Sequence, residues 1–414
     1  MKAILLRALA LLLVLVLTLS LCTACSLDGL LAFINNVNSS FKGGEDGGED
    51  GGSKGPLTPP VLEGSDLYNR AYYQTLTDEE KLIYTTLYQG FSSLSTSVEV
   101  GEASSQYAIF RAFSAVLRDY PTLFWMNGGA SLSGETLLTT KYTITPYILQ
   151  GEGSLAEMKA ALDGVVAEVV ANARQEATLY EQILYIHDYL VNNCVYDSES
   201  VDDIMSASGS TVHPSSTAYG CLVKGKAVCA GYAAAFSILL QELGVPCIRV
   251  RGSRIGGEAH EWNALNFDGE SYYVDVTWND PVTTDGSNTL SHLYYFINEA
   301  ELTKTHAFRE NKDENALDEI IPTCTATEYE YYRYFGYYCE SYSRTAFQSV
   351  AQKQKDNETV TARFGSLSAL RAAKTDLVDN GYLRSVPALA LRLGGKAFTY
   401  AVNEEALTVT FYLP

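Results

Sequence analysis

Positive charge is scarce in this sequence. Lysine and arginine contribute 29 of its 414 residues and aspartate and glutamate contribute 49, which leaves a formal net charge of −20. A surface that binds nucleic acid needs concentrated lysine and arginine to neutralise phosphates, and the sequence contains no such run. We therefore expect no nucleic-acid partner, and we attribute the acidic excess to solubility.

Histidine is also scarce, with five residues. His187 lies next to Asp188 but has no partner four residues away, as a pair of helical metal ligands would require. Cys221 and Cys229 are eight residues apart, unlike the spacing of zinc sites. Three further histidines show no partner pattern: His213, His292 and His306. We predict no metal and no cofactor, and we interpret His187 as structural.

The amino terminus carries the features of an export signal. Lys2 and Arg7 precede an apolar run over residues 8–21, which is too short and too early for a membrane span. Residues 1–24 are therefore predicted to be a signal peptide. Residues 22–25, Cys-Thr-Ala-Cys, resemble a lipoprotein-processing box, and this resemblance implies that lipidated Cys25 anchors the exported protein to the outer face of a bacterial membrane. Ordinary cleavage near Ala24 stays open and would give a secreted protein.

A tether follows the predicted anchor. Residues 42–60 are rich in glycine, acidic residues and proline and lack apolar periodicity, so they cannot bury enough surface to fold. We assign residues 25–64 to the lipid anchor and a disordered spacer that holds the folded part away from the membrane.

A candidate nucleophile stands at the start of a predicted helix. After Cys229, apolar residues recur at helical spacing until Gly244 and Pro246 end the pattern: Tyr232, Phe236, Leu239 and Leu243. In the first turn, unpaired backbone N–H groups and the helix dipole favour a thiolate over a thiol. An N–H at this end would also stabilise an oxyanion.

His260 and Asp275 flank a hairpin signal. Asp268 and Gly269 form a two-residue turn signal between alternating apolar residues. With that turn, Asp275 is the diagonal neighbour of His260 on one face of the sheet, with Cβ atoms about 7 Å apart. A three-residue loop would instead put the two side chains on opposite faces. In this arrangement His260 accepts the Cys229 proton and later protonates the leaving amine, while Asp275 orients the imidazole.

The same segments resemble the bacterial transglutaminase-like superfamily of papain-like Cys-His-Asp proteins, which cleave or exchange amide bonds. The resemblance covers residues 178–300 and rests on these motifs: residues 187–191, 196–197, 218–220, 225–233, 260–263, 275–281 and 294–296. It implies Cys229 as nucleophile, His260 as base and Asp275 as orienting acid. Cys221 stands where a small residue such as alanine is usual. The superfamily includes cross-linking enzymes, proteases, other amide hydrolases and inactive members, so the resemblance does not fix the substrate.

We predict an α+β fold in which the helix bearing Cys229 packs on an antiparallel sheet bearing His260 and Asp275. This transglutaminase-like catalytic domain is assigned to residues 178–320. A helical module at 65–177 precedes it, with capping boxes at Thr77 and Ser154. A small α+β domain at 321–414 follows, and its tyrosine-rich start is interpreted as half-buried strands packed against a helix, with an aromatic ligand platform as the alternative.

The remaining cysteines do not indicate a disulfide framework. If Cys22 is removed, Cys25 lipidated and Cys229 free, an odd set remains, which cannot pair completely: Cys194, Cys221, Cys247, Cys324 and Cys339.

Two function classes follow from these observations. In the first, a cell-surface thiol enzyme forms a Cys229 thioester with a peptide, a protein or a cell-wall cross-bridge and passes the acyl group to water or to an amine. In the second, the fold is an inactive binding or scaffolding module. The sequence does not decide between hydrolysis and transamidation.

Overall fold

The computed structural model describes residues 70–134, 141–150, 153–206, 212–280, 290–309, 313 and 315–414. The predicted signal peptide, Cys25 and the predicted tether lie outside the described residues, as does Pro281 of the motif at residues 275–281. Within the described ranges, no helix combines the length and apolarity that a bilayer crossing needs.

The N-terminal module combines helices with a sheet, so its prediction as helical was incomplete. Helices α4 (Asp78–Ser92) and α5 (Gln106–Asp119) follow the short α3 (Ala71–Gln74) and pack against each other. They also contact an antiparallel sheet of order β1-β3-β2 (Val98–Glu102, Lys141–Ile148 and Met126–Gly134). β2 is rich in glycine and serine, and β1 is only five residues long, so neither shows a long run of β-branched residues that would reveal the strand.

Three helices cluster around the central helix of the next domain. α10 (Cys229–Leu243) is buried along most of its length and contacts α6 (Leu155–Ala173), α7 (Leu179–Asn193) and α9 (Ala218–Leu222). The capping boxes predicted at Thr77 and Ser154 both form, and Thr178 forms a third at the start of α7. Helix α6, which the sequence placed in the N-terminal module, therefore packs on α10 in the core of the central domain.

Short elements connect these helices. They are the paired strands β4 (Val195–Tyr196) and β5 (Lys226–Ala227), helix α8 (Val201–Ser206), and the 3₁₀ turns Ser198–Ser200 and Pro214–Ser216.

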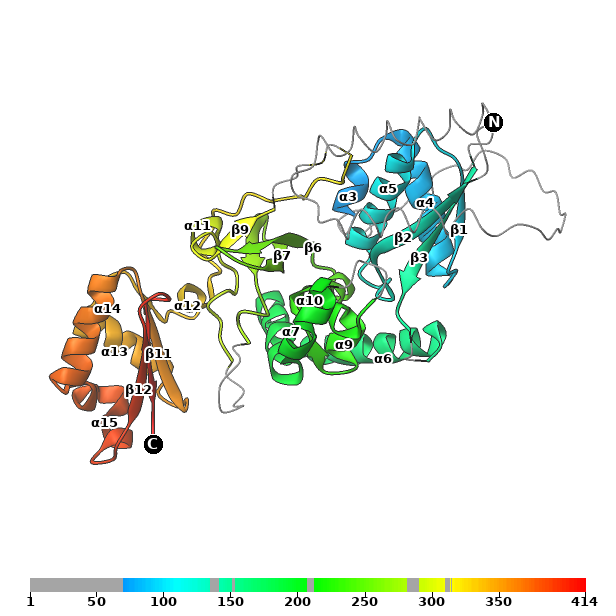
Figure 1. Cartoon of the computed structure of the whole chain (residues 1–414). Coiled ribbons are helices and arrows are strands. Elements are labelled where there is room, and N and C mark those ends of the chain that lie inside the picture. Colours follow the sequence, from blue (N-terminus) through cyan, green and yellow to red (C-terminus); the bar gives the residue numbers. More distant parts are fainter. Residues whose placement is uncertain are drawn as a thin grey trace, which may run out of the picture.

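A four-stranded antiparallel sheet of order β8-β7-β6-β9 packs on α10 (Figure 1). Its strands are β6 (Cys247–Arg254), β7 (Ala259–Phe267), β8 (Glu270–Val274) and β9 (His306–Phe308). Asn263 ties the two layers together, because its side-chain N–H donates to the Ala233 carbonyl at 3.0 Å. The short helix α11 (Glu299–Leu302) precedes β9. This helix-on-sheet core is the predicted α+β arrangement.

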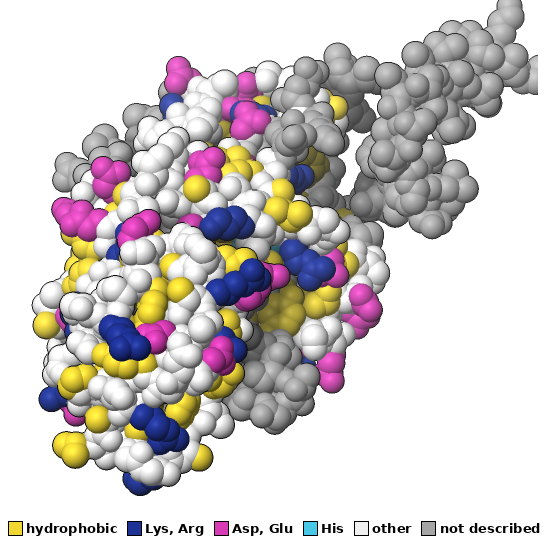
Figure 2. Space-filling model, turned by 90° about the vertical axis from the view of Figure 1, so that its left-hand side faces the viewer, with side chains coloured by type: hydrophobic (Ala, Val, Ile, Leu, Met, Phe, Trp, Pro, Cys, Tyr) yellow, Lys and Arg dark blue, Asp and Glu magenta, His cyan; other side chains and the backbone are white. Residues whose placement is uncertain are grey.

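The C-terminal domain has a core of its own. Its sheet, of order β10-β11-β13-β12, comprises Tyr338–Cys339, Thr359–Phe364, Thr408–Tyr412 and Thr399–Asn403. Helices α13 (Arg344–Lys353), α14 (Leu367–Lys374) and α15 (Pro387–Leu393) accompany it, with helical turns at Thr375–Asp379 and Tyr382–Ser385. In Figure 1 this domain forms a lobe beside the central domain, on the side away from the N-terminal module. On the face shown in Figure 2, basic and acidic side chains are interspersed.

The tyrosine-rich segment differs from its prediction as strands. Residues 331–334 form the short helix α12 (Tyr331–Tyr334), whose first turn is capped by the Glu330 side chain, and the only strand that follows directly is the two-residue β10. Tyr334 stacks on Tyr180 of α7 with ring centroids 3.8 Å apart. The tyrosines therefore contribute to the junction between the central and C-terminal domains.

Candidate active site

Helix α10 presents Cys229 at its first residue, as the sequence predicted. Cys229 is partly exposed, whereas the other five cysteines of the described residues are buried. Within the described part of the chain, no side chain caps the start of α10. Its first N–H groups are therefore available to a thiolate or an oxyanion beside the sulfur.

Close approach of a preceding loop fixes this end of the helix. The Val228 N–H donates to the Ser215 carbonyl at 2.8 Å. A Cβ at Gly231 would lie 2.5 Å from that same carbonyl oxygen and 3.0 Å from the Thr217 carbonyl oxygen. Only glycine lets the loop pack this tightly against the first turn of α10.

The hairpin joins His260 and Asp275 through the predicted turn. Asp268 and Gly269 both have positive φ, 53° and 83°, as a two-residue type I′ turn requires. The resulting register pairs Asn263 with Val274. His260 Nε2 lies 2.6 Å from Asp275 Oδ2. The predicted contact between base and acid is thus present.

The imidazole of His260 faces both the acid and the thiol. Burial by itself lowers the pKa of His260, but the charge and hydrogen bond of Asp275, together with a hydrogen bond to Cys229, outweigh it and raise the pKa to about 10. Because Nε2 is bonded to Asp275, Nδ1 is the nitrogen left to face the sulfur. The site therefore favours a charged imidazolium beside the sulfur of Cys229.

Asp275 is buried and receives three donors. Its Oδ2 accepts from His260 and also from His306 Nε2 at 3.0 Å, and its Oδ1 accepts from the Trp278 backbone N–H at 3.1 Å. Burial raises the pKa of Asp275, but the two imidazoles lower it well below the ordinary range. The carboxylate therefore stays charged and its orientation is fixed from three sides.

The sequence interpretation missed His306. It had found no partner for this residue, yet β9 pairs with β6 and so brings His306 to the carboxylate of Asp275. The short motif His-Ala-Phe gives no local signal for a pairing between strands more than 50 residues apart.

Comparison with known proteins identifies the part of the chain that carries this site. Residues 164–277 match the family model of the transglutaminase-like superfamily. We call this region the transglutaminase-like domain after the model that it matches. No curated protein sequence matches the chain.

Three solved structures are similar to parts of the chain. One is described as a TGase, with 16% identity over 37% of this chain and 45% of that chain and a TM-score of 0.28. A candidate cysteine protease from Cytophaga hutchinsonii has 13% identity over 39% of this chain and 66% of that chain, with a TM-score of 0.24. A candidate protease from Parabacteroides distasonis has 13% identity over 35% of each chain, with a TM-score of 0.20. The chain spans less than two thirds of each of these structures.

A cleft of about 370 Å³ opens beside His260. It is lined by Tyr196, Arg254, Glu258, Ala259, His260, Thr277, Trp278 and Asp280. Burial, followed by the nearby charges of Cys229 and Glu258, raises the pKa of Tyr196 to about 12. The Tyr196 phenol is therefore protonated at neutral pH and offers the cleft a hydrogen-bond donor.

A second histidine network supports the loop that follows Asp275. Asp188 Oδ1 lies 2.8 Å from His187 Nδ1 and 2.8 Å from His292 Nε2. The buried His187 also accepts at Nε2 from the Asn279 side chain at 2.9 Å. This agrees with a structural role for His187, but it corrects the expectation that His292 has no partner.

Both histidine groups bring potential metal ligands together. In each group, His187 with Asp188 and His292 or His260 with Asp275 and His306, the candidate ligand atoms lie within 4.8 Å of one another. Hydrogen bonds from the imidazoles to the central carboxylate account for both arrangements without an ion. The absence of a metal remains a prediction.

Proposed function

We propose that this protein is a cysteine-dependent enzyme that cleaves or transfers amide acyl groups. One observation carries the proposal: a buried Asp275 holds His260 at 2.6 Å, and His260 in turn hydrogen-bonds to Cys229 at the uncapped start of α10. The three groups have the identities, order and contacts that nucleophilic acyl transfer requires. An inactive scaffold would have no need to keep this arrangement complete.

In the proposed reaction, the Cys229 thiolate attacks the carbonyl carbon of a glutamine side chain or a peptide bond. The carbonyl oxygen becomes an oxyanion beside the first N–H groups of α10. The C–N bond then breaks as the His260 imidazolium protonates the leaving amine, which leaves a thioester on Cys229. His260 next removes a proton from water or from an acceptor amine, whose attack on the thioester releases the acid or the new amide and the thiol.

We further propose that the enzyme acts at the outer face of a bacterial membrane on a peptide, a protein or a cell-wall cross-bridge. The support is the predicted signal peptide, the lipidation motif ending at Cys25, and the glycine-rich acidic tether. Secretion without a lipid is the alternative outcome, and mass analysis of the mature amino terminus separates the two.

Alkylation with iodoacetamide tests the activation of Cys229. We expect faster reaction at Cys229 than at a free cysteine at neutral pH, because the imidazolium stabilises the thiolate. His260→Ala should abolish the advantage and shift the reaction to the pH range of a free thiol, near about 8.5. If Cys229 reacts no faster than a free thiol and His260→Ala changes nothing, the enzymatic proposal fails.

Intact-mass analysis of cell-surface proteins and wall peptides then separates the reactions. Samples are incubated with native protein or Cys229→Ala in the presence of a labelled primary amine. A mass gain equal to the amine indicates transamidation, whereas fragments or deamidation indicate hydrolysis. No change with either protein would favour the scaffold.

A further inference from the structure

A second pocket, separate from the cleft beside His260, lies between the N-terminal module and the transglutaminase-like domain. It has a volume of about 290 Å³. The N-terminal module contributes residues from α5, β2 and the loop between them, including Arg118, Phe124 and Met126. The transglutaminase-like domain contributes residues from α9, α10, β6 and β7.

One wall of this pocket is formed by a residue next to the candidate nucleophile. Ala230, which follows Cys229, and Glu261, which follows His260, both line it. Consecutive Cα atoms are about 3.8 Å apart, so the pocket begins one residue from the candidate nucleophile. Side chains alternate along a strand, so Glu261 and His260 point to opposite faces of β7, and the pocket and the cleft lined by His260 lie on opposite sides of this strand. Ala234 lies one turn further along the same face of α10, and its small side chain leaves this part of the pocket open.

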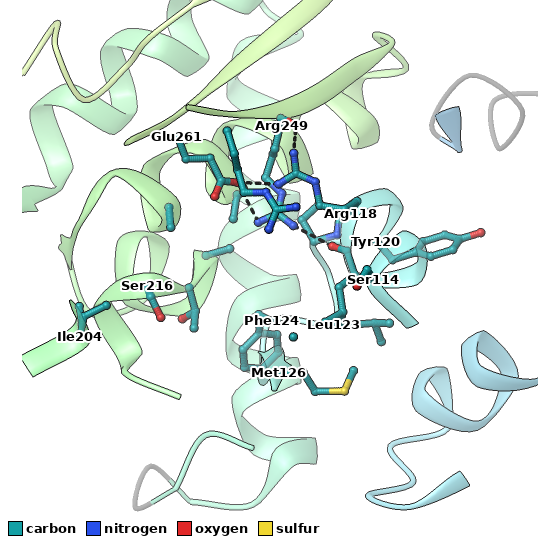
Figure 3. A pocket seen from close by; sticks show the side chains of 18 residues that line it. Ser114, Arg118, Tyr120, Leu123, Phe124, Met126, Ile204, Ser216, Arg249 and Glu261 are labelled. Atoms are coloured by element: carbon teal, nitrogen blue, oxygen red, sulfur yellow. Dashed lines mark hydrogen bonds and ion pairs between the residues drawn. The ribbon is translucent and has the colours of Figure 1, made fainter. Parts of the chain in front are cut away.

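One end of the pocket is charged and the other is apolar (Figure 3). Arg118, Arg249 and Glu261 gather at one end, whereas Leu123, Phe124 and Met126 lie at the other. A ligand that fits both ends carries an anionic group next to an apolar group.

Positive charge exceeds negative charge at the charged end. Glu261 pairs with Arg118 at 3.4 Å and with Arg249 at 3.3 Å, and Glu319 pairs with Arg118 at 2.7 Å and with Arg251. The ion pairs of this cluster thus join three arginines to two glutamates. Burial, followed by the charges of Arg118 and Arg251, lowers the pKa of Arg249 despite Glu261. In a chain with a net charge of −20, this local positive excess is the opposite of the overall balance.

The cluster also leaves donors unused. The Nε atoms of Arg118 and Arg249 are buried and have no hydrogen-bond partner among the described residues. A buried guanidinium normally uses all its donors, because an unmade bond to a charged group costs about 1–3 kcal/mol or more. Two arginines would already balance Glu261 and Glu319, so ion pairing between the two domains does not explain why the cluster has a third arginine.

We propose that this pocket is the subsite that binds the carboxylate of a peptide substrate, with the adjacent apolar side chain in the Phe124 end. The proposal rests on the proposed function and assigns its substrate class: peptides that carry a free carboxylate, on an apolar terminal residue, close to the amide that Cys229 attacks. Arg251, whose side chain is 36% exposed, is the arginine with the most freedom to meet that carboxylate.

Two alkylating probes test this subsite: N-iodoacetyl-leucine, which has a free carboxylate, and the neutral N-iodoacetyl-leucinamide. In each reaction the Cys229 sulfur forms a bond to the methylene carbon and iodide leaves. The rates are measured at Cys229 by peptide mass mapping of the full chain, and each is divided by the rate of the same probe with N-acetylcysteine. This normalisation removes the intrinsic difference between the probes.

We expect the normalised ratio of acid to amide to be about tenfold in native protein and to fall as salt screens the arginines. Arg251→Gln should reduce the ratio to below about threefold. Arg371→Gln, which removes the same charge from an ion pair on the C-terminal domain, should leave both rates unchanged.

A ratio near one in native protein, or an equal ratio in native protein and Arg251→Gln, would overturn the subsite and leave the cluster as a link between domains. Loss of the ratio in Arg254→Gln instead would place the carboxylate in the cleft beside His260. The neutral probe reports independently on the proposed function. If that probe reacts at Cys229 no faster than at a free thiol, the enzyme proposal fails, while the ratio at the same sulfur still measures the subsite.

Discussion

Asp275 connects the base to the body of the protein. Two imidazoles and one backbone N–H hold its carboxylate, and it lies in a buried setting in which an unpaired charge would be costly. Of the two imidazoles, His306 is the one that does not bond to Cys229, since its Nδ1 lies 2.8 Å from the Thr305 hydroxyl. We infer that His306 is a positioning residue, which acts on catalysis through the orientation of Asp275 and His260.

Two substitutions of His306 separate positioning from packing. His306→Phe keeps an aromatic ring against Trp278, whose ring centroid lies 4.5 Å away, but removes the donor to Asp275. His306→Gln loses the ring but keeps an N–H donor. A charge-assisted hydrogen bond contributes about 1.5–3 kcal/mol, so we expect His306→Phe to slow Cys229 alkylation at neutral pH about tenfold or more. His306→Gln should retain more of the rate.

The pH profile of alkylation by iodoacetamide provides the measurement for both variants. A role limited to packing predicts the reverse order, with His306→Phe closer to native. It also predicts that the profile keeps its shape in both variants.

The contact between His260 and Asp275 also makes stability depend on pH. The pKa of His260 is raised to about 10 in the folded protein. The contribution of His260 to the unfolding free energy is therefore fully present below its pKa in the unfolded chain, about 6.5, and is lost as the pH rises toward 10. The pKa of Asp275 is lowered, so its contribution is present above about pH 4 and is lost in more acidic solution.

Urea unfolding of native protein and His260→Gln across this range tests the expectation. The native protein should lose a few kcal/mol relative to the variant between about pH 6.5 and 10. A difference in unfolding free energy that stays constant over this interval would contradict the pair as described.

The start of α10 is the element on which the nucleophile depends. Gly231 allows the loop at Ser215 and Thr217 to contact the first turn, and this contact sets where Cys229 lies relative to the hairpin. The hairpin itself is fixed by its turn, because a two-residue type I′ loop permits one register only. Helix α10 and the hairpin are each specified by local sequence. We infer that the contact between Cys229 and His260 depends on how closely the loop at Ser215 and Thr217 approaches Gly231.

Gly231→Ala tests this dependence. The new Cβ would lie 2.5 Å from the Ser215 carbonyl oxygen and 2.8 Å from the Ala227 Cβ, so backbone must move. We expect a loss of about 1–3 kcal/mol in unfolding free energy and slower Cys229 alkylation. Gly164→Ala in α6 is the matched control, because nothing lies within 4 Å of its added Cβ. It should stabilise the helix by up to about 1 kcal/mol and leave alkylation unchanged.

Unchanged alkylation in Gly231→Ala would show that the position of Cys229 does not depend on this contact. The two glycines thus compare the same chemical change inside and outside the site.

The N-terminal module is joined to the transglutaminase-like domain through buried charge. Arg118 of α5 donates to the Arg249 carbonyl and pairs with Glu261 and Glu319, and its side chain is 5% exposed. Gln241 of α10 adds a bond to the Asp119 carbonyl at 3.1 Å, and Phe124 stacks on Tyr219. These contacts favour a single unit in which the N-terminal module forms part of the candidate substrate pocket.

Arg118→Met tests how strongly the two parts are coupled. Removing one partner of a buried ion pair leaves Glu261 and Glu319 undercompensated, which costs about 3–5 kcal/mol. Urea unfolding followed by tryptophan fluorescence reports on both parts, since Trp125 lies in the N-terminal module and Trp262 and Trp278 lie in the central domain. Arg371→Met, which breaks an exposed pair with Glu404, should cost less than about 1 kcal/mol. Equal losses in the two variants would rule out the coupling.

Several features of the fold and site were predictable because their signals are local. The capping boxes, the start of α10 at Cys229 and its end at Gly244 follow from helix-end chemistry within a few residues. The contact of His260 with Asp275 follows from the turn at Asp268 and from the alternation of side chains along each strand. The sheet of the N-terminal module was missed because β2 is glycine-rich and β1 is short, so both strands depend on the helices they pack on.

The sequence by itself thus predicted the candidate nucleophile, base and acid, and it determined the helix and the hairpin that carry them. Only the tertiary structure decided that His306 supports Asp275, that His292 joins His187 through Asp188, and that Arg118 reaches Arg249 and Glu261. The physical reason is separation along the chain. Turns, caps and periodicity act over a few residues, whereas these contacts form only when distant segments pack and buried charges must find partners.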